Sequence, residues 1–491
     1  KYMITFLICL AILVGAYFTY GKYLEKVCGI DPAAIVPSRK SFDGVDFMPL
    51  PRWKTFLIQL LNIAGLGPIF GAVLGAAYGP VAFLWITLGG VFFGAMHDFV
   101  AAAMSLKRNG ESLPEIIGHY LGNGTRQFMR IFTVLLMVLV GAVFMSQPAV
   151  LIASHVEIPV EGIAFGTSTW ELVIILGVIL LYYIFATVLP IDKIIGRIYP
   201  LFGSALLIMA LGILGVLLFK SDVYHIPELT SLRNQIASPD KFPIMPMLFT
   251  TIACGAISGF HATQSPMMAR CVESESETRF VFYGAMITES IIALIWAAIA
   301  MAFWGNVEGL NLAIAENGGS AAKLIDIITS QTLGTVVATI VVGGVIACAI
   351  TSGDTAFRSA RLIIADMLGI SQEKLPSRLF VSLPLFIGAM IIIFGLPFGA
   401  IWSYFAWTNQ TLATITLWAI VAYLSQRNKP LIIALLPAIV MTYVCISYIF
   451  ISPIMVGMSS RLLAYGIAGT ITLIITLYTL YTIKRNGKGL S

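Results

Sequence analysis

Runs of apolar residues long enough to cross a lipid bilayer recur along this chain. A bilayer-spanning helix needs about 20 apolar residues, and charged residues make up only 11% of the chain, against about 25% in soluble domains. The sequence therefore predicts an all-helical protein with thirteen membrane spans. The runs lie near 3–20, 55–77, 80–104, 128–154, 169–188, 199–219, 243–268, 280–304, 333–356, 377–395, 398–424, 430–452 and 464–482.

The basic residues indicate which side of the membrane each loop occupies. With the N-terminus outside, 23 of the 29 Lys and Arg residues fall in inner loops, the side on which positive charge accumulates. We therefore predict an outer N-terminus and a cytoplasmic C-terminus. Because 3–20 has no small-residue cleavage pattern, we expect a retained helix there rather than a cleaved signal.

Two of these runs carry residues that interrupt a helix. The run 55–77 contains Gly65, Gly67 and Pro68, and proline both lacks an N–H and clashes with the preceding turn. Backbone groups freed at membrane depth must face protein or a wet cavity, so we expect unwound backbone at 64–68. Glycines spaced four apart from Gly67 onward fit a second interpretation, a seam of close helix packing.

The run 243–268 repeats this pattern, because Gly255 and Gly259 precede Pro266. We expect unwound backbone at 255–266. Two interrupted spans in corresponding positions are typical of secondary transporters built from inverted repeats. The first run enters from the inner side and the second from the outer side, so the two halves should be inverted.

This reasoning divides the chain into two five-helix repeats with flanking segments. The predicted parts are an N-terminal helix and inner loop (1–54), the first repeat (55–219), an outer loop (220–242), the second repeat (243–424) and two C-terminal helices (425–491). We also expect a short helix near 321–330, inside the outer loop 305–332.

Ionisable side chains inside a membrane are functional candidates by default. Glu289 lies about nine residues into its run, roughly 14 Å deep, which suits a proton carrier. A permanently protonated or hydrogen-bonded structural glutamate between helices is the alternative. Asp98, beside His97, lies nearer the inner surface, where a gate salt bridge to an arginine or lysine is the favoured interpretation. Asp354 has Arg358 four residues on, the spacing of a helical ion pair.

A substrate carboxylate could bind the N–H groups freed after Gly67 and Pro68, at the positive end of a half-helix. No Arg or Lys is expected at mid-membrane depth, so an anionic substrate would depend on these backbone donors. For His261, a structural hydrogen bond to a carbonyl is an open alternative. The other predicted substrate-site residues are Gly65, Ser258, Gly259, His261, Gln264, Asn409 and Gln410.

Metal, cofactor, enzyme and nucleic-acid chemistry have no support in the sequence. The six cysteines are scattered without metal-ligand spacing and are interpreted as small apolar fillers. No nucleophile–base motif or phosphate-binding loop stands out, and the basic residues follow the loops rather than forming a nucleic-acid patch. We expect no metal, no cofactor and no enzymatic activity; the expected partners are the bilayer, a small substrate and a coupling cation.

Several motifs occur in order along the chain. They are D-G-V-D-F at 43–47, A-G-L-G-P-I-F-G at 64–71, H-D-F at 97–99, S-L-K-R-N-G-E-S-L-P-E-I at 105–116, G-A-I-S-G-F-H at 255–261, T-S-G-D-T-A-F-R-S-A-R at 351–361 and T-N-Q-T-L-A at 408–413. Together they resemble the carbon starvation protein A family of bacterial inner-membrane transporters, which covers peptide and pyruvate carriers. The resemblance spans about residues 40–425.

The resemblance implies the five-plus-five inverted-repeat fold of amino-acid transporters and an ion-coupled importer of short peptides or pyruvate during carbon limitation. It favours protons over sodium. In transporters of this fold, a sodium site would use the hydroxyls of Thr351 and Ser352 with the carbonyls of Ala64 or Gly65, since hard cations prefer oxygen ligands. A channel or a nutrient sensor is the alternative, although charge rings and a soluble signalling domain are missing.

The chain departs from the family in two places. Ile58 and Gln59 stand where longer members carry a His-His pair, which makes a proton relay through those positions impossible. Gln264, Ser265 and Pro266 replace a serine-glycine-threonine stretch, which leaves the substrate open between peptides and pyruvate.

Overall fold

A computed structural model describes residues 3–487 except 45, 154–169, 189–190 and 373. The described residues are helical, with no strand among them. The first half contains α1 (Ile4–Phe18), α2 (Tyr20–Cys28), α3 (Pro37–Lys40), α4 (Arg52–Ile63), η1 (Gly67–Gly71), α5 (Ala72–Gly75), η2 (Ala76–Tyr78), α6 (Val81–Leu84), η3 (Trp85–Ala95), α7 (Met96–Lys107), α8 (Leu113–Leu121), α9 (Asn123–Ala153), α10 (Trp170–Val188) and α11 (Ile191–Phe219). The second half contains η4 (Ile244–Leu248), α12 (Phe249–Thr251), α13 (Gly259–Ala269), η5 (Glu275–Glu277), η6 (Arg279–Tyr283), α14 (Gly284–Phe303), α15 (Val307–Glu316), α16 (Ala321–Leu333), α17 (Thr335–Leu368), α18 (Leu375–Gly395), α19 (Phe398–Gln426), α20 (Ile432–Ile451) and α21 (Arg461–Gly487).

Nine helical segments of the described chain are long and apolar enough to span a membrane, or ten if one bent pair counts as a span. The protein is therefore a multi-pass membrane protein. Three expected spans are not among the ten. The run 243–268 is divided into short helices, α19 carries the polar sequence T-N-Q-T, and α17 includes side chains outside the described part. The expected span 169–188 is helical from Trp170 onward. Residue 169, with which this span was expected to begin, lies outside the described residues.

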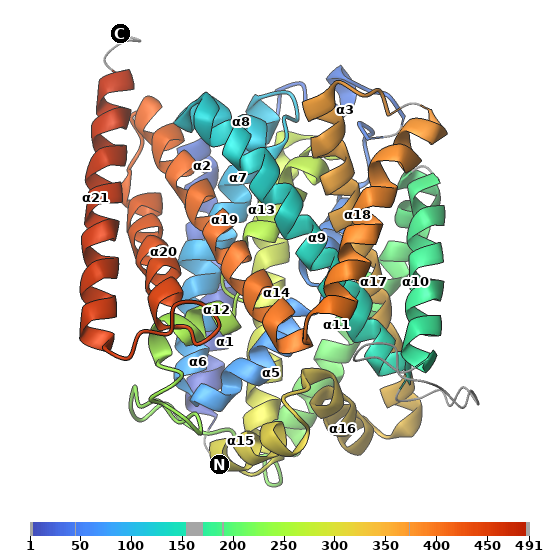
Figure 1. The fold of residues 1–491 in the computed structure, drawn as a ribbon, viewed down its shortest axis with the longest axis vertical. Coiled ribbons are helices and arrows are strands. Elements are labelled where there is room, and N and C mark those ends of the chain that lie inside the picture. Colours follow the sequence, from blue (N-terminus) through green and yellow to red (C-terminus); the bar gives the residue numbers. More distant parts are fainter. Residues whose placement is uncertain (1–2, 45, 154–169, 189–190, 373, 488–491) are drawn as a thin grey trace.

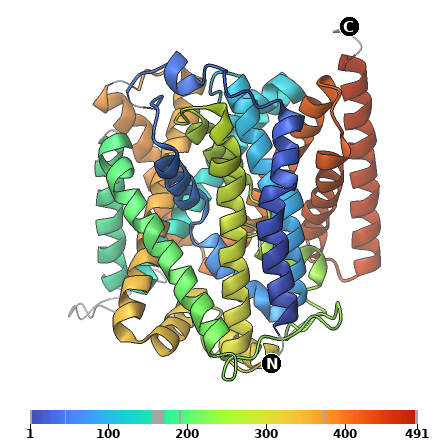
Figure 2. The ribbon, with the colours of Figure 1, turned by 180° about the vertical axis from the view of Figure 1, so that it is seen from behind.

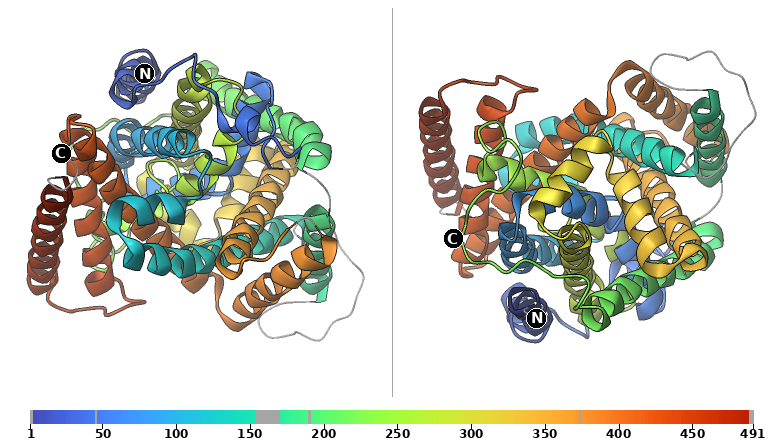
Figure 3. Two further views of the ribbon diagram at one scale, coloured as in Figure 1. Left: turned by 90° about the horizontal axis from the view of Figure 1, so that it is seen from above. Right: turned by 90° about the horizontal axis from the view of Figure 1, so that it is seen from below.

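The helices form one bundle with the two ends of the chain at opposite ends of the molecule (Figure 1). The segment containing α14 lies inside, with 83% of its apolar window buried, whereas only 22% of the α21 window is buried. End-on views place α21 and α10 at the periphery (Figure 3). Seen from behind, α1 also runs along the outside (Figure 2), where it packs against α14. Thus α14 is a core helix.

The first interrupted span is confirmed as broken. Helix α4 ends at Ile63 and η1 begins at Gly67, and the two parts are bent by 54°. The non-helical residues are 64–66, which we call the first break. They are the first part of the stretch 64–68 that was expected to be unwound. Pro68 lies instead in the first turn of η1, where its missing N–H removes no helical hydrogen bond.

The second span is also broken, but earlier than expected. Helix α12 ends at Thr251 and α13 begins at Gly259, so the unwound stretch is 252–258 rather than 255–266. Pro266 lies inside α13, where packing with neighbouring helices makes a proline tolerable in a membrane protein. We call residues 252–258 the second break.

The glycines of the first span pack against the second break. A methyl group added at Gly67 would overlap Cys254, and one at Gly71 would lie 2.7 Å from the carbonyl oxygen of Thr251. Side chains at these positions would push the two broken spans apart. Both interpretations of the glycines therefore hold: the span is unwound, and its glycines form a close seam.

The loop expected at 305–332 contains two helices. Helix α16 confirms the helix expected near 321–330, and α15 was not expected. The Asn306 side chain accepts a hydrogen bond of 2.8 Å from the Gly309 N–H, so the sequence N-V-E-G is the signal that could have located this helix start.

Candidate functional site: a buried chain of ionisable side chains

Four ionisable side chains from three segments form a chain in the core. His97 Nδ1 lies 2.8 Å from Asp98 Oδ1, and the other Asp98 oxygen lies 3.0 Å from His261 Nδ1. The far side of the His261 ring faces α14, with Nε2 3.4 Å from Glu289 Oε2. All four side chains are fully buried. His261 thus links the two acids and can carry a proton between them.

Glu289 is buried as expected, but its carboxylate lacks hydrogen bonds from the described residues. Neither of its carboxylate oxygens has a hydrogen-bond partner among the described residues. An ionised carboxylate without hydrogen bonds is costly in a protein interior. The described residues thus offer Glu289 no hydrogen bond, and a permanently protonated structural glutamate remains the alternative to a proton carrier.

Asp98 corrects the favoured interpretation of a gate salt bridge. Its two oxygens face His97 and His261 rather than an arginine or lysine. The neighbouring His97 was visible in the sequence, but His261 lies 163 positions further along the chain. Only the packing of α7 against α13 brings the two together.

The expected Asp354–Arg358 ion pair is confirmed at 3.7 Å. Arg358 is only 7% exposed and lines a cavity of about 30 Å³ together with Asn62 and Thr355, which is room for one water molecule. A buried cation therefore lies beside the first broken span, although the sequence had led us to expect backbone donors alone.

Ser352 and Thr351, the candidate sodium ligands, point to different partners. Ser352 Oγ donates to the Leu61 carbonyl at 2.8 Å, whereas Thr351 Oγ1 donates to the Cys348 carbonyl in its own helix at 2.9 Å. The Ala64 carbonyl lies 3.0 Å from the Cys348 thiol, which donates to it. Helix α17 thus contacts the last turn of α4 through Ser352 and the first break through Cys348.

Asn409 holds the second break in place. Its Oδ1 accepts a hydrogen bond of 2.7 Å from the Phe260 N–H, and its amide nitrogen lies 3.0 Å from Ser258 Oγ. A side chain at Gly259 would collide with the α19 backbone. Asn409, Ser258 and Gly259, predicted as substrate-site residues, therefore join the start of α13 to α19.

Replacing Asn409 with leucine should destabilise the protein. The Phe260 N–H would be left buried without an acceptor, which costs about 1–3 kcal/mol. We expect a lower thermal unfolding midpoint for the purified variant in detergent. Asn317→Ala is the control, because among the described residues the Asn317 amide donates only to the Ala313 carbonyl, in the helix that ends just before it. Equal midpoints for the two variants would contradict this role.

Several amide side chains are buried on α4, α13 and α19, of which α4 ends at the first break and α13 begins after the second. Gln264 donates from Nε2 to Thr263 Oγ1 at 2.9 Å, and Gln410 donates to the Phe249 carbonyl at 3.1 Å. Among the described residues, four buried amide oxygens have no hydrogen-bond partner. They are Gln59 Oε1, Asn62 Oδ1, Gln264 Oε1 and Gln410 Oε1. Such groups can accept hydrogen bonds from a polar substrate. Sequence reasoning missed Asn62, and it noted Gln59 only as a departure from the family.

Comparison with known proteins supports the resemblance stated above. A family model described as carbon starvation protein CstA matches residues 1–154 and 147–343. The chain is 42% identical to an uncharacterized membrane protein of Haemophilus influenzae, over 66% of this chain and 98% of that protein. It is 30% identical to a peptide transporter CstA of Campylobacter jejuni, over 60% of this chain and 49% of the relative.

It is also 28% identical to the pyruvate/proton symporter BtsT of Escherichia coli, over 58% of this chain and 47% of that protein. The chain thus spans about half the length of these two named transporters. The family model therefore matches more than half of the chain, from residue 1 to residue 343. The chain belongs to the carbon starvation protein CstA family.

Proposed function

We propose that this protein is a secondary active importer of a small carboxylate-bearing nutrient, a short peptide or pyruvate, and that protons drive it. The observation that carries the proposal is the buried chain from Asp98 through His261 to Glu289, which lies beside two broken spans. Relatives named as peptide transporters and as a pyruvate/proton symporter support the same class.

In this mechanism Glu289 is the proton carrier. A neutral, protonated Glu289 fits its site, because the site offers the carboxylate no hydrogen bond among the described residues. After deprotonation, the charge can be met by a protonated His261, whose other nitrogen already contacts Asp98. Substrate binding and closure of the spans would decide which side of the membrane exchanges this proton.

We propose that the substrate binds at the first break. The cavity lined by Asn62 and Arg358, about 30 Å³, is too small for a nutrient molecule, so it would have to widen during transport. Arg358 would then contact the substrate carboxylate together with the N–H groups near Gly65, Gly67 and Pro68. The free oxygens of Gln264 and Asn62 would accept hydrogen bonds from an ammonium group.

The proposed architecture is a five-plus-five inverted repeat, with 55–219 and 243–424 as the repeats and thirteen spans in all. It would place the N-terminus outside a bacterial inner membrane and the C-terminus in the cytoplasm. The two ends of the chain do lie at opposite ends of the molecule (Figure 1), as an odd number of spans requires.

Uptake into proteoliposomes tests this function. We expect labelled pyruvate or dialanine to accumulate against its gradient when a pH gradient is imposed, and a sodium gradient alone to give no accumulation. Accumulation with sodium alone would move coupling to Thr351 and Ser352. Equilibration without accumulation under either gradient would indicate a channel, and no uptake of any substrate would favour a sensor.

A further inference from the structure

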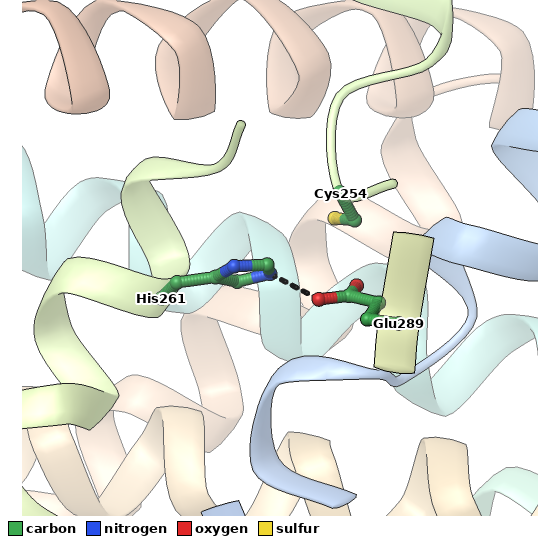
Figure 4. Close-up of side chains that lie close together, drawn as sticks. All are labelled: Cys254, His261 and Glu289. Atoms are coloured by element: carbon green, nitrogen blue, oxygen red, sulfur yellow. Dashed lines mark ion pairs between the residues drawn. The ribbon is translucent and has the colours of Figure 1, made fainter. Parts of the chain in front are cut away.

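We infer that Cys254, His261 and Glu289 form a binding site for a divalent transition-metal ion such as Zn²⁺. Figure 4 shows the three side chains converging from the second break, α13 and α14. Their sulfur, nitrogen and oxygen atoms all lie within 4.8 Å of one another, and all three residues are buried. Zinc bonds of about 2.0–2.3 Å put ligand atoms about 3.3–3.8 Å apart, so small movements would close the site.

The atoms that face one another have unused bonding capacity. Neither Glu289 oxygen nor His261 Nε2 has a hydrogen-bond partner among the described residues, although Nε2 lies 3.4 Å from Oε2. Such groups cost free energy when buried. A metal ion between them would satisfy an imidazole lone pair and a carboxylate together.

The donor set selects the class of ion. One thiolate, one imidazole and one carboxylate form a mixed sulfur, nitrogen and oxygen set, which suits Zn²⁺ or Co²⁺. Mg²⁺ and Ca²⁺ prefer oxygen alone. The charges of a thiolate and a carboxylate also cancel those of a divalent ion, so the ion and its three ligands are neutral together once Cys254 and a protonated Glu289 each release a proton to solvent. Neutrality favours binding in a buried site.

Asp98 accepts a hydrogen bond from the histidine of the proposed metal site, as carboxylates commonly do behind metal-binding histidines. It accepts from His261 Nδ1 at 3.0 Å, which leaves the lone pair on Nε2, the atom that faces Cys254 and Glu289. A carboxylate behind the ligating histidine fixes the ring and strengthens its binding. Polar groups also lie near the sulfur, since Ser258 Oγ is 3.7 Å from Cys254 Sγ.

Metal in this site would inhibit transport. It would occupy Glu289 and His261, two members of the proposed proton chain, and would tie the second break to α14. This consequence rests on the proposed function, whereas metal binding itself does not. Inhibition and binding are therefore measured separately.

Titration of the purified full chain in detergent with Co²⁺, in a non-thiol reductant, tests binding. We expect one Co²⁺ per chain, a thiolate-to-cobalt charge-transfer band, and loss of the band when Zn²⁺ is added. Cys254→Ser should abolish the band, and both Cys254→Ser and Glu289→Gln should weaken binding about 10–100-fold or more, since even supporting residues of metal sites have effects of this size. Cys445→Ser, a buried cysteine beside Thr414 on another helix, should bind as the wild type does.

A wild-type protein without the charge-transfer band would overturn the proposal, as would a Cys254→Ser variant that keeps the band. Size-exclusion profiles show whether each variant is folded. If Cys254→Ser does not fold, Glu289→Gln and His261→Gln test the same ligand set independently. In proteoliposomes, Zn²⁺ should reduce wild-type uptake. If transport fails in every assay but the cobalt charge-transfer band appears, the metal site is supported and the proposed function is wrong.

Discussion

Glu289→Gln should abolish uphill uptake driven by a pH gradient while leaving substrate exchange across equilibrated membranes intact. Glutamine keeps the size of the side chain but cannot release a proton. Exchange does not require the empty, deprotonated carrier to return across the membrane, so it should persist. We expect accumulation to fall to the level seen without a gradient, measured with labelled substrate in proteoliposomes.

The matched control is Glu308→Gln, which changes an exposed acid in the first turn of α15. It should accumulate substrate as the wild type does. If Glu289→Gln still concentrates substrate with a pH gradient alone, another group carries the proton, and Asp354 and then Asp98 are the next candidates. A variant that loses exchange as well as accumulation would assign Glu289 to substrate binding or to structure.

The features that the sequence predicted well depend on residues that are close together along the chain. The length of an apolar run predicts a span, and the cluster of Gly65, Gly67 and Pro68 lies at the place where α4 ends and the span bends. The burial of Glu289 followed from its position in the middle of an apolar run. The Asp354–Arg358 pair followed from the four-residue spacing in the same way.

The features that sequence reasoning missed depend on residues far apart in the chain. The end of the second break is set by Asn409, which accepts from the Phe260 N–H across 149 positions. The histidine partner of Asp98 and the convergence of Cys254 with Glu289 likewise come from packing of separate helices. Spacing along the chain cannot reveal such a ligand set, so the cysteines were interpreted as apolar fillers.

Gly67→Ala should reduce uptake at least about tenfold, because the new methyl group would overlap both Sγ and Cβ of Cys254. The new methyl group and the Cys254 side chain would each be held by a broken span in a packed core, where overpacking costs about 1–3 kcal/mol. Gly177→Ala is the control, since no atom lies within 4 Å of a methyl group added there. Initial uptake rates are compared at equal amounts of inserted protein.

A second change can show that this particular contact is responsible. Gly67→Ala combined with Cys254→Gly removes both overlapping atoms, and the nearest remaining Cys254 atom, Cα, is 3.8 Å from the added methyl. The double variant should therefore be better folded and more active than Gly67→Ala alone. If the single variant transports normally, the two breaks do not need close contact. If the double variant is no better than the single one, the defect arises from the altered backbone at Gly67 rather than from the seam.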